Sequence, residues 1–177
     1  MSDAVLVIPS TYNGHSVTEI GERAFAGITR PPDVTIPGSV TIIGGSAFNG
    51  CTGLTSVVIP DGVPSIGNST FTGRAGPAAI DIPEGVTSIA TWAFQNCTGL
   101  KSIVIPDSVT SFGDYAFDGC AGLTSIQIPT GVTSITLCVF IPRTGLGTLV
   151  LPSCVTLIDA AASSLLSRIT CVRTPAF

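Results

Sequence analysis

Apolar and polar positions along the chain follow one pattern that repeats every 23 residues. The dipeptide Ile-Pro marks its register: it begins at residues 8, 36, 59, 82, 105 and 128, and Leu151-Pro152 and Thr174-Pro175 continue the series. The first step is 28 residues long, because five extra residues fall around Ser10–His15. A fixed period of this length is typical of a stacked repeat protein, and it predicts about eight rungs, of which the first and last are incomplete.

Each repeat predicts a short strand followed by a turn. The residues before the proline read apolar-x-x-apolar-x-apolar, as in Leu100, Ile103 and Ile105, so the last two apolar positions alternate. This alternation predicts a strand with one buried face. The proline lacks an N–H and ends the strand, and residues that suit turns follow, such as Asp107-Ser108.

Further apolar columns complete a core. Val-x-x-Ile follows the turn, and a small residue then precedes a phenylalanine at the same register position of six repeats: Phe25, Phe48, Phe71, Phe94, Phe117 and Phe140. A 23-residue unit cannot bury these groups alone, so rungs whose strands lie about 4.8 Å apart must bury them against one another. The segment at Asp114–Phe117 is long enough only for a turn of α or 3₁₀ helix.

This repeat resembles the BspA-like leucine-rich repeat, whose unit reads approximately L-x-x-I-x-I-P-x-x-V-x-x-I-G-x-x-A-F-x-x-C; Leu54–Phe71 and Leu123–Ile135 match it closely. The resemblance covers nearly the whole chain. It implies a right-handed, curved leucine-rich repeat solenoid, mainly β with short 3₁₀ or α turns, with a parallel sheet along one face and a single repeat domain over residues 1–177. It also implies a non-catalytic protein-binding or adhesion module, because members of the family are mostly surface-exposed or secreted proteins that bind other proteins or host matrix.

The chain departs from the repeat unit in several places. Arg74 and Pro77 replace the cysteine and leucine of one rung, and Pro142-Arg143 replaces Gly-Cys in another. The terminal repeat degenerates near residues 159–177, where Ala160–Leu166 predicts a helical segment before one more strand at Ile169–Pro175. Neither end shows a strong polar cap. An uncapped end exposes core and sheet edge, so the alternative function is a structural solenoid that self-assembles head to tail into a fibre or a dimer.

Composition excludes some classes of function. The chain is 45% hydrophobic and 10% charged, which favours a folded core over disorder. Its net charge is −4 and its seven Lys and Arg residues are spread out, so no basic stripe favours nucleic acid. No apolar run approaches the roughly 18 residues of a membrane span, and the N-terminus lacks the features of a signal peptide. The compartment stays open, although the resemblance implies a cell-surface or secreted protein.

No set of residues predicts catalysis or a cofactor. The single histidine, His15, has no serine or cysteine partner marked by a motif, which argues against a hydrolase triad. The six cysteines include no C-x-x-C pair and have no histidine nearby, which argues against zinc. The resemblance implies that the shared column of Cys51, Cys97 and Cys120 is a ladder of buried free thiols, and a disulfide is the alternative. Cys138, Cys154 and Cys171 lie in other columns.

Two polar columns suggest weaker alternatives. Asp61, Glu84 and Asp107 take the same turn position on successive rungs, where stacked carboxylates could bind Ca²⁺ or simply be solvated turn residues. A threonine column, broken by Pro64, could order water and bind ice, or could merely suit exposed extended backbone; its members are Thr18, Thr41, Thr87, Thr110, Thr133 and Thr156.

The expected binding surface is the outward side of the strands. Its column is small, weakly apolar and nearly uncharged, which fits either a flat platform for a protein partner or ordinary strand residues; it comprises Val7, Thr35, Val58, Asp81, Val104, Gln127, Val150 and Arg173. The Ser10–His15 loop, with Tyr12, Asn13 and His15, is expected to add a contact at the rim, because insertions in repeats tend to form binding features. Trp92 and Tyr115 share a column and are expected to pack together as structure.

Overall fold

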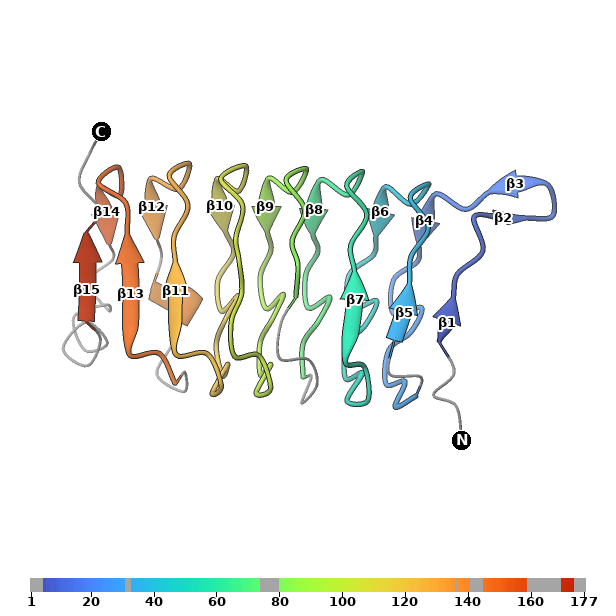
Figure 1. The fold of residues 1–177 in the computed structure, drawn as a ribbon, viewed down its shortest axis with the longest axis horizontal. Coiled ribbons are helices and arrows are strands. Elements are labelled where there is room, and N and C mark those ends of the chain that lie inside the picture. Colours follow the sequence, from blue (N-terminus) through green and yellow to red (C-terminus); the bar gives the residue numbers. More distant parts are fainter. Residues whose placement is uncertain are drawn as a thin grey trace.

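The computed structural model describes residues 5–30, 33–73, 80–135, 137–140, 145–158 and 170–173. The chain forms a mainly β parallel solenoid whose rungs follow one another along a single axis, so that the two termini lie at opposite ends (Figure 1). Among the described residues, no helix is long and apolar enough to cross a membrane.

The first strand column follows the predicted segments before the prolines. Its strands pair in parallel, so that residue 7 pairs with 35 and 35 with 58. The last repeat is one residue shorter, because Val150 pairs with Val172, so Val172 takes the outward position that the sequence predicts for Arg173. Single bridges at Asp81 and Val104 continue the column where no longer strand forms. Its strands are β1 (Leu6–Val7), β5 (Asp33–Thr35), β7 (Ser56–Val58), β11 (Ser125–Gln127), β13 (Thr148–Leu151) and β15 (Thr170–Arg173).

A second strand column follows the turns, in the Val-x-x-Ile segments. Here the repeat pattern predicts buried apolar positions, and the structure shows that each Ser-Ile pair is also a two-residue parallel strand. The isoleucine is buried while the serine faces outward, which is the alternation that a strand requires. These strands are β4 (Glu19–Ile20), β6 (Ile42–Ile43), β8 (Ser65–Ile66), β9 (Ser88–Ile89), β10 (Ser111–Phe112), β12 (Ser134–Ile135) and β14 (Leu157–Ile158).

The core lies between the two columns and the phenylalanine turns, and it confirms the predicted stack. All six phenylalanine rings of the column are stacked, with centroids 5.3–5.8 Å apart and planes within 7–13° of one another. The five from Phe48 to Phe140 are fully buried. Because burying one such side chain contributes about 1.5–3 kcal/mol, each rung stabilises its neighbours.

The third side of each rung consists of turns around the phenylalanine. A 3₁₀ helix, η1 (Leu137–Phe140), forms in one rung, whereas the equivalent Asp114–Phe117 segment is a turn. Two residues per turn adopt left-handed backbone, as Trp92 (φ 59°) and Asn96 (φ 56°) do. In that rung the N–H groups of Trp92, Phe94 and Asn96 donate to carbonyl oxygens of the next rung at 2.7–3.0 Å.

The predicted count of about eight rungs differs slightly from the structure, which forms about five complete turns. The first strand column still passes through eight levels, but the terminal levels do not close a full turn within the described residues. The predicted strand at 169–175 is confirmed over Thr170–Arg173. Arg74, Pro77, Pro142-Arg143 and the predicted helix at 160–166 lie outside the described residues.

The insertion near the N-terminus is a β-hairpin. Strands β2 (Thr11–Tyr12) and β3 (His15–Ser16) pair antiparallel, and Val17 donates its N–H to the Ser10 carbonyl oxygen at 2.8 Å at the base. Asn13 (φ 50°) and Gly14 (φ 78°) form the two-residue turn, and two positive φ values match the type I′ turn that Asn-Gly favours. The hairpin extends beyond β1 at the N-terminal end (Figure 1).

Candidate functional site

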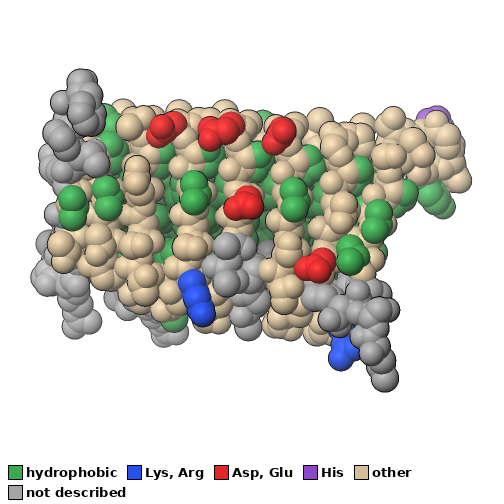
Figure 2. Space-filling view, viewed as in Figure 1, with side chains coloured by type: hydrophobic (Ala, Val, Ile, Leu, Met, Phe, Trp, Pro, Cys, Tyr) green, Lys and Arg blue, Asp and Glu red, His purple; other side chains and the backbone are tan. Residues whose placement is uncertain are grey.

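The outward residues of the first strand column form an exposed, regular surface, which we call the strand face. Val58 and Val104 are 65% and 74% exposed, whereas the valines of the Val-x-x-Ile segments, such as Val63 and Val109, are fully buried. Thr35, Asp81 and Gln127 are also exposed, and Val150 is half-buried. The strand face therefore presents separated apolar side chains to solvent, as Figure 2 shows on the side that faces the reader.

The backbone holds the strand face rigidly. Most outward residues lie between two buried ones, as Val58 does between Val57 and Ile59, and Val104 lies between the buried Ile103 and the partly buried Ile105. Parallel pairing fixes neighbouring rungs about 4.8 Å apart. A partner would therefore meet side chains whose positions are already set, which lowers the entropy cost of binding.

Acidic side chains follow the strand face along one edge (Figure 2). Asp61, Glu84 and Asp107 are exposed in the turn after the strand, one on each of three rungs. Asp107 accepts hydrogen bonds from the N–H and the hydroxyl of Thr130 on the next rung, at 3.2 and 3.3 Å. Within the described ranges, no three His, Cys, Asp or Glu side chains come together to hold a metal ion. The sequence-based calcium candidate thus supplies one carboxylate per rung rather than a cage.

The hairpin places its candidate residues at the end of the stack. Tyr12 pairs with His15 across the two strands, and both side chains are exposed, Tyr12 by 69%. Because the hairpin adjoins the first level, the structure does not bring Tyr12 and His15 together with the central residues of the strand face, such as Val104. The hairpin can contact only a partner that extends beyond the N-terminal rung.

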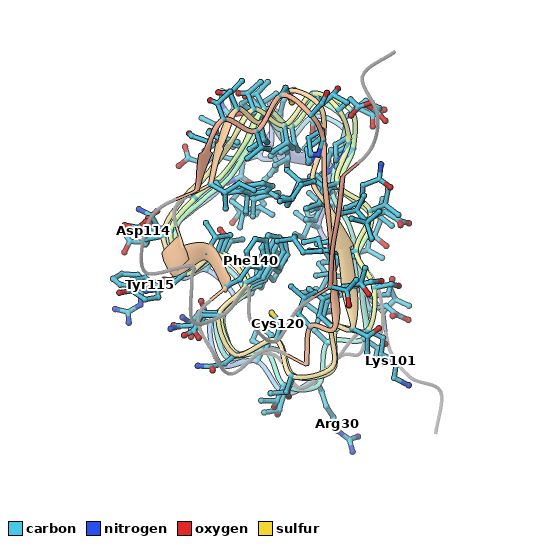
Figure 3. The ribbon with its side chains drawn as sticks, turned by 90° about the vertical axis from the view of Figure 1, so that its left-hand side faces the viewer. Arg30, Lys101, Asp114, Tyr115, Cys120 and Phe140 are labelled. Atoms are coloured by element: carbon cyan, nitrogen blue, oxygen red, sulfur yellow. The ribbon has the colours of Figure 1, made fainter. Side chains whose placement is uncertain are left out.

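Trp92 and Tyr115 pack on each other, as their shared column predicts. Their ring centroids are 6.3 Å apart with planes at 26°, and Trp92 is 44% exposed. Figure 3 shows Tyr115, beside Asp114, on the turn side of the solenoid, away from Lys101. Both aromatic residues have left-handed backbone (φ 59° and 60°), a conformation that bulky side chains rarely adopt.

The shared cysteine column is a ladder of free, buried thiols, as predicted. Cys51, Cys97 and Cys120 each donate Sγ–H to the carbonyl oxygen of the phenylalanine on the preceding rung, at 2.9–3.1 Å. The hydrogen bond with the Cys97 side chain, followed by burial, raises the pKa of Cys120 far above its ordinary value. A thiol held in the protonated state is a poor nucleophile, so this column is structural. Cys154 is free and half-buried.

The threonine column also has a structural use. The hydroxyls of Thr41, Thr87, Thr110 and Thr156 donate to the carbonyl oxygen of the same column position on the preceding rung, at 3.1–3.5 Å. These threonine hydroxyl groups therefore donate hydrogen bonds between rungs of the molecule rather than to ordered water at its surface. This arrangement accounts for the column without ice binding.

The chain is similar to known leucine-rich repeat proteins. The family model of the BspA type leucine rich repeat region matches residues 8–76 and 77–176, in six copies. A crystal structure of a leucine rich repeat protein from T. pallidum is 31% identical, with a TM-score of 0.78, over 92% of this chain and 82% of that one. A leucine rich cell surface protein from Faecalibacterium prausnitzii is 26% identical with a TM-score of 0.64; the match covers 97% of this chain but 60% of that protein. A search of curated proteins gives no match.

Proposed function

The chain belongs to the BspA-type leucine-rich repeat family, and from that premise we propose that it is a non-catalytic protein-binding or adhesion module that uses the strand face as its platform. The relative from Faecalibacterium prausnitzii is a cell surface protein. The compartment we propose for this chain is accordingly the cell surface or the extracellular space, with a surface or matrix protein as partner.

The exposed valines of the strand face carry this proposal. Val58 and Val104 are more than half exposed, although the other apolar columns of the same rungs lie in a continuous buried core. Folding gains little from apolar groups left in water, whereas the centre of a protein interface is apolar. A rigid row of such groups supports binding by surface complementarity across several rungs.

The hairpin supports the same function as an accessory element. It uses a defined turn to present Tyr12 and His15 beyond the first rung, and its residues are exposed. Tyrosine is enriched in binding surfaces because it offers a large contact area with a polar tip. We assign the hairpin to the rim of the interface, where it would strengthen binding without determining it.

A second candidate is self-association through the N-terminal end. Leu6, Phe25 and Ile28 are only partly buried there, and they line a small apolar cavity of about 10 Å³ with Val34 and Phe48. A second copy could cover this surface. The hairpin projects past β1, however, so a coaxial copy would have to displace it or pack beside it. Sedimentation across a range of concentrations tests this candidate: a monomer at every concentration would eliminate it.

Binding measurements with surface-immobilised matrix and cell-surface proteins test the main proposal. The double variant Val58→Ser/Val104→Ser is expected to weaken binding about tenfold or more, because it removes apolar area at the centre of the platform. Ile42→Ser is the matched control, since Ile42 is an exposed aliphatic residue on β6 in the other strand column. Removal of the hairpin should have a smaller effect. A loss of binding in Ile42→Ser but not in the double variant would refute the strand face as the platform.

A further inference from the structure

Four carboxylates gather on the three central rungs of the strand face. Asp81 lies in the outward column between Val58 and Val104, and its backbone forms a parallel β-bridge with each of them. Asp61, Glu84 and Asp107 lie in the turns that follow on the same three rungs. All four side chains are exposed, and Figure 2 shows a row of acidic groups along the edge with another acidic group on the face itself.

These charges are close enough to act together. Three residues separate Asp81 from Glu84 along the chain, which is at most about 10 Å of extended backbone, and successive rungs lie about 4.8 Å apart. The four carboxylates thus fit within a square about 10 Å wide, comparable to the screening length of about 8 Å at physiological ionic strength. A positively charged group that approaches the strand face would therefore interact with all four carboxylates at once.

The charge is concentrated in the middle of the strand face. On the preceding rung Asp33 is half-buried and accepts a hydrogen bond from the Thr55 hydroxyl at 3.2 Å. On the rung that follows Asp107, Gln127 and Thr130 replace the acidic residues of the two columns. Lys101 lies on the rung of Val104, six residues before Asp107, and Figure 3 shows it pointing outward near the foot of the strands. Nothing described on the central rungs neutralises the patch, so its charge is available to a partner.

We infer that the strand face recognises a basic protein surface, in which Lys or Arg side chains flank apolar ones. This inference rests on the proposed function and names the partner's chemistry. The binding patch consists of Val58, Asp61, Asp81, Glu84, Val104 and Asp107, and we call it the acidic strand patch. The two valines contribute buried apolar area, while the carboxylates steer the partner and set its orientation. A second copy of the chain does not fit, because it would bring two acidic patches into contact on molecules with a net charge of −4.

Selection from a phage-displayed library of random peptides tests the inference on the full chain. Enriched peptides should carry a net positive charge together with apolar residues. Synthetic copies should bind about tenfold more weakly at 300 mM than at 50 mM salt, because exposed ion pairs are screened. Asp81→Asn/Glu84→Gln should weaken their binding about three- to tenfold. Glu19→Gln/Glu22→Gln removes the same charge from exposed residues outside the strand face and should change nothing.

The outcomes separate this inference from the proposed function. Neutral or acidic peptides that lose binding in Val58→Ser/Val104→Ser would overturn the inference but leave the strand face as a platform. Peptides unaffected by either pair of substitutions, or the absence of any enriched peptide, would count against both. Since all the substituted residues are exposed, unchanged circular dichroism and melting temperature should show that each variant is folded.

Discussion

The burial and packing of a single residue in this chain depend on its neighbours on the adjacent rungs. Phe94 stacks on Phe71 at 5.5 Å and on Phe117 at 5.3 Å, whereas Phe25 stacks on one side alone and stays half-buried. The same residue type in the same column therefore has a different energetic weight at the centre and at the end. The cysteine column also depends on the adjacent rung, because a phenylalanine carbonyl oxygen there accepts a hydrogen bond from each thiol.

Phe94→Ala should lower the free energy of unfolding by about 3–5 kcal/mol, since it removes a fully buried ring from a packed stack. Phe25→Ala is the matched variant at the end of the same column and should cost less than half as much. Urea unfolding followed by circular dichroism measures both values. Equal losses at the two positions would contradict a core built by stacking.

Cys120 makes stability depend on alkaline pH. In the unfolded chain a thiol ionises around its ordinary pKa of 9.0, whereas in the native state the Cys97 side chain and burial raise the pKa of Cys120 far above that value. Above about pH 9 the native state therefore binds more protons than the unfolded state, and the free energy of unfolding should fall as pH rises. Cys120→Ala should reduce this slope when unfolding is measured between pH 8 and 10.5. An unchanged slope would disprove the assignment.

Secondary-structure elements here are short, and two kinds of signal define them. The alternation before each proline predicts the first strand column, and it holds because one face of every strand packs on the core. For the second column the sequence predicts only buried apolar positions, since two-residue strands such as Ser88–Ile89 exist through pairing with adjacent rungs and have no local signature. The sequence likewise does not predict the left-handed backbone of Trp92, which is held against residue preference by a hydrogen bond from its N–H to the Asp114 carbonyl oxygen on the next rung.

The hairpin could have been predicted. Asn13-Gly14 between Tyr12 and His15 is the typical type I′ signal, but strands of two residues leave no alternating pattern, so the pattern of apolar and polar positions predicts only a loop there. The outward column follows the repeat except at its last position, where the prediction of Arg173 is wrong because the shorter last repeat places Val172 there. How exposed each apolar member is, such as Val104 at 74%, emerges only from the folded surface.

Gly14→Ala should loosen the hairpin without affecting the solenoid. A Cβ at this position meets no atom within 4 Å, so the cost is the left-handed backbone (φ 78°), about 1–2 kcal/mol. Hydrogen exchange of the Thr11–Ser16 amides should accelerate several-fold while the melting temperature stays constant. Gly38→Ala, which has equal space and no left-handed φ, should change neither quantity. A drop in melting temperature with Gly14→Ala would mean that the hairpin supports the core.

At the scale of the whole molecule, the residues that repeat from rung to rung stabilise the stack. The residues that differ between rungs are the candidates for partner binding. Phenylalanine, cysteine and threonine columns join each rung to the next, and they account for most of the sequence pattern. The strand face instead varies from Thr35 through Val58 and Asp81 to Gln127, without an architectural reason for each choice. This division directs the search for a partner to the strand face and its hairpin.

Site-specific photocrosslinking tests the central claim most directly. A photoreactive aromatic amino acid is placed at position 104, on the strand face, and in a separate variant at position 92, which is exposed on the turn side. Each variant is incubated with a protein that binds the chain and then irradiated. Strand-face binding predicts covalent complexes from position 104 and none from position 92. Crosslinks from position 92 alone would show that the partner binds the opposite side of the solenoid.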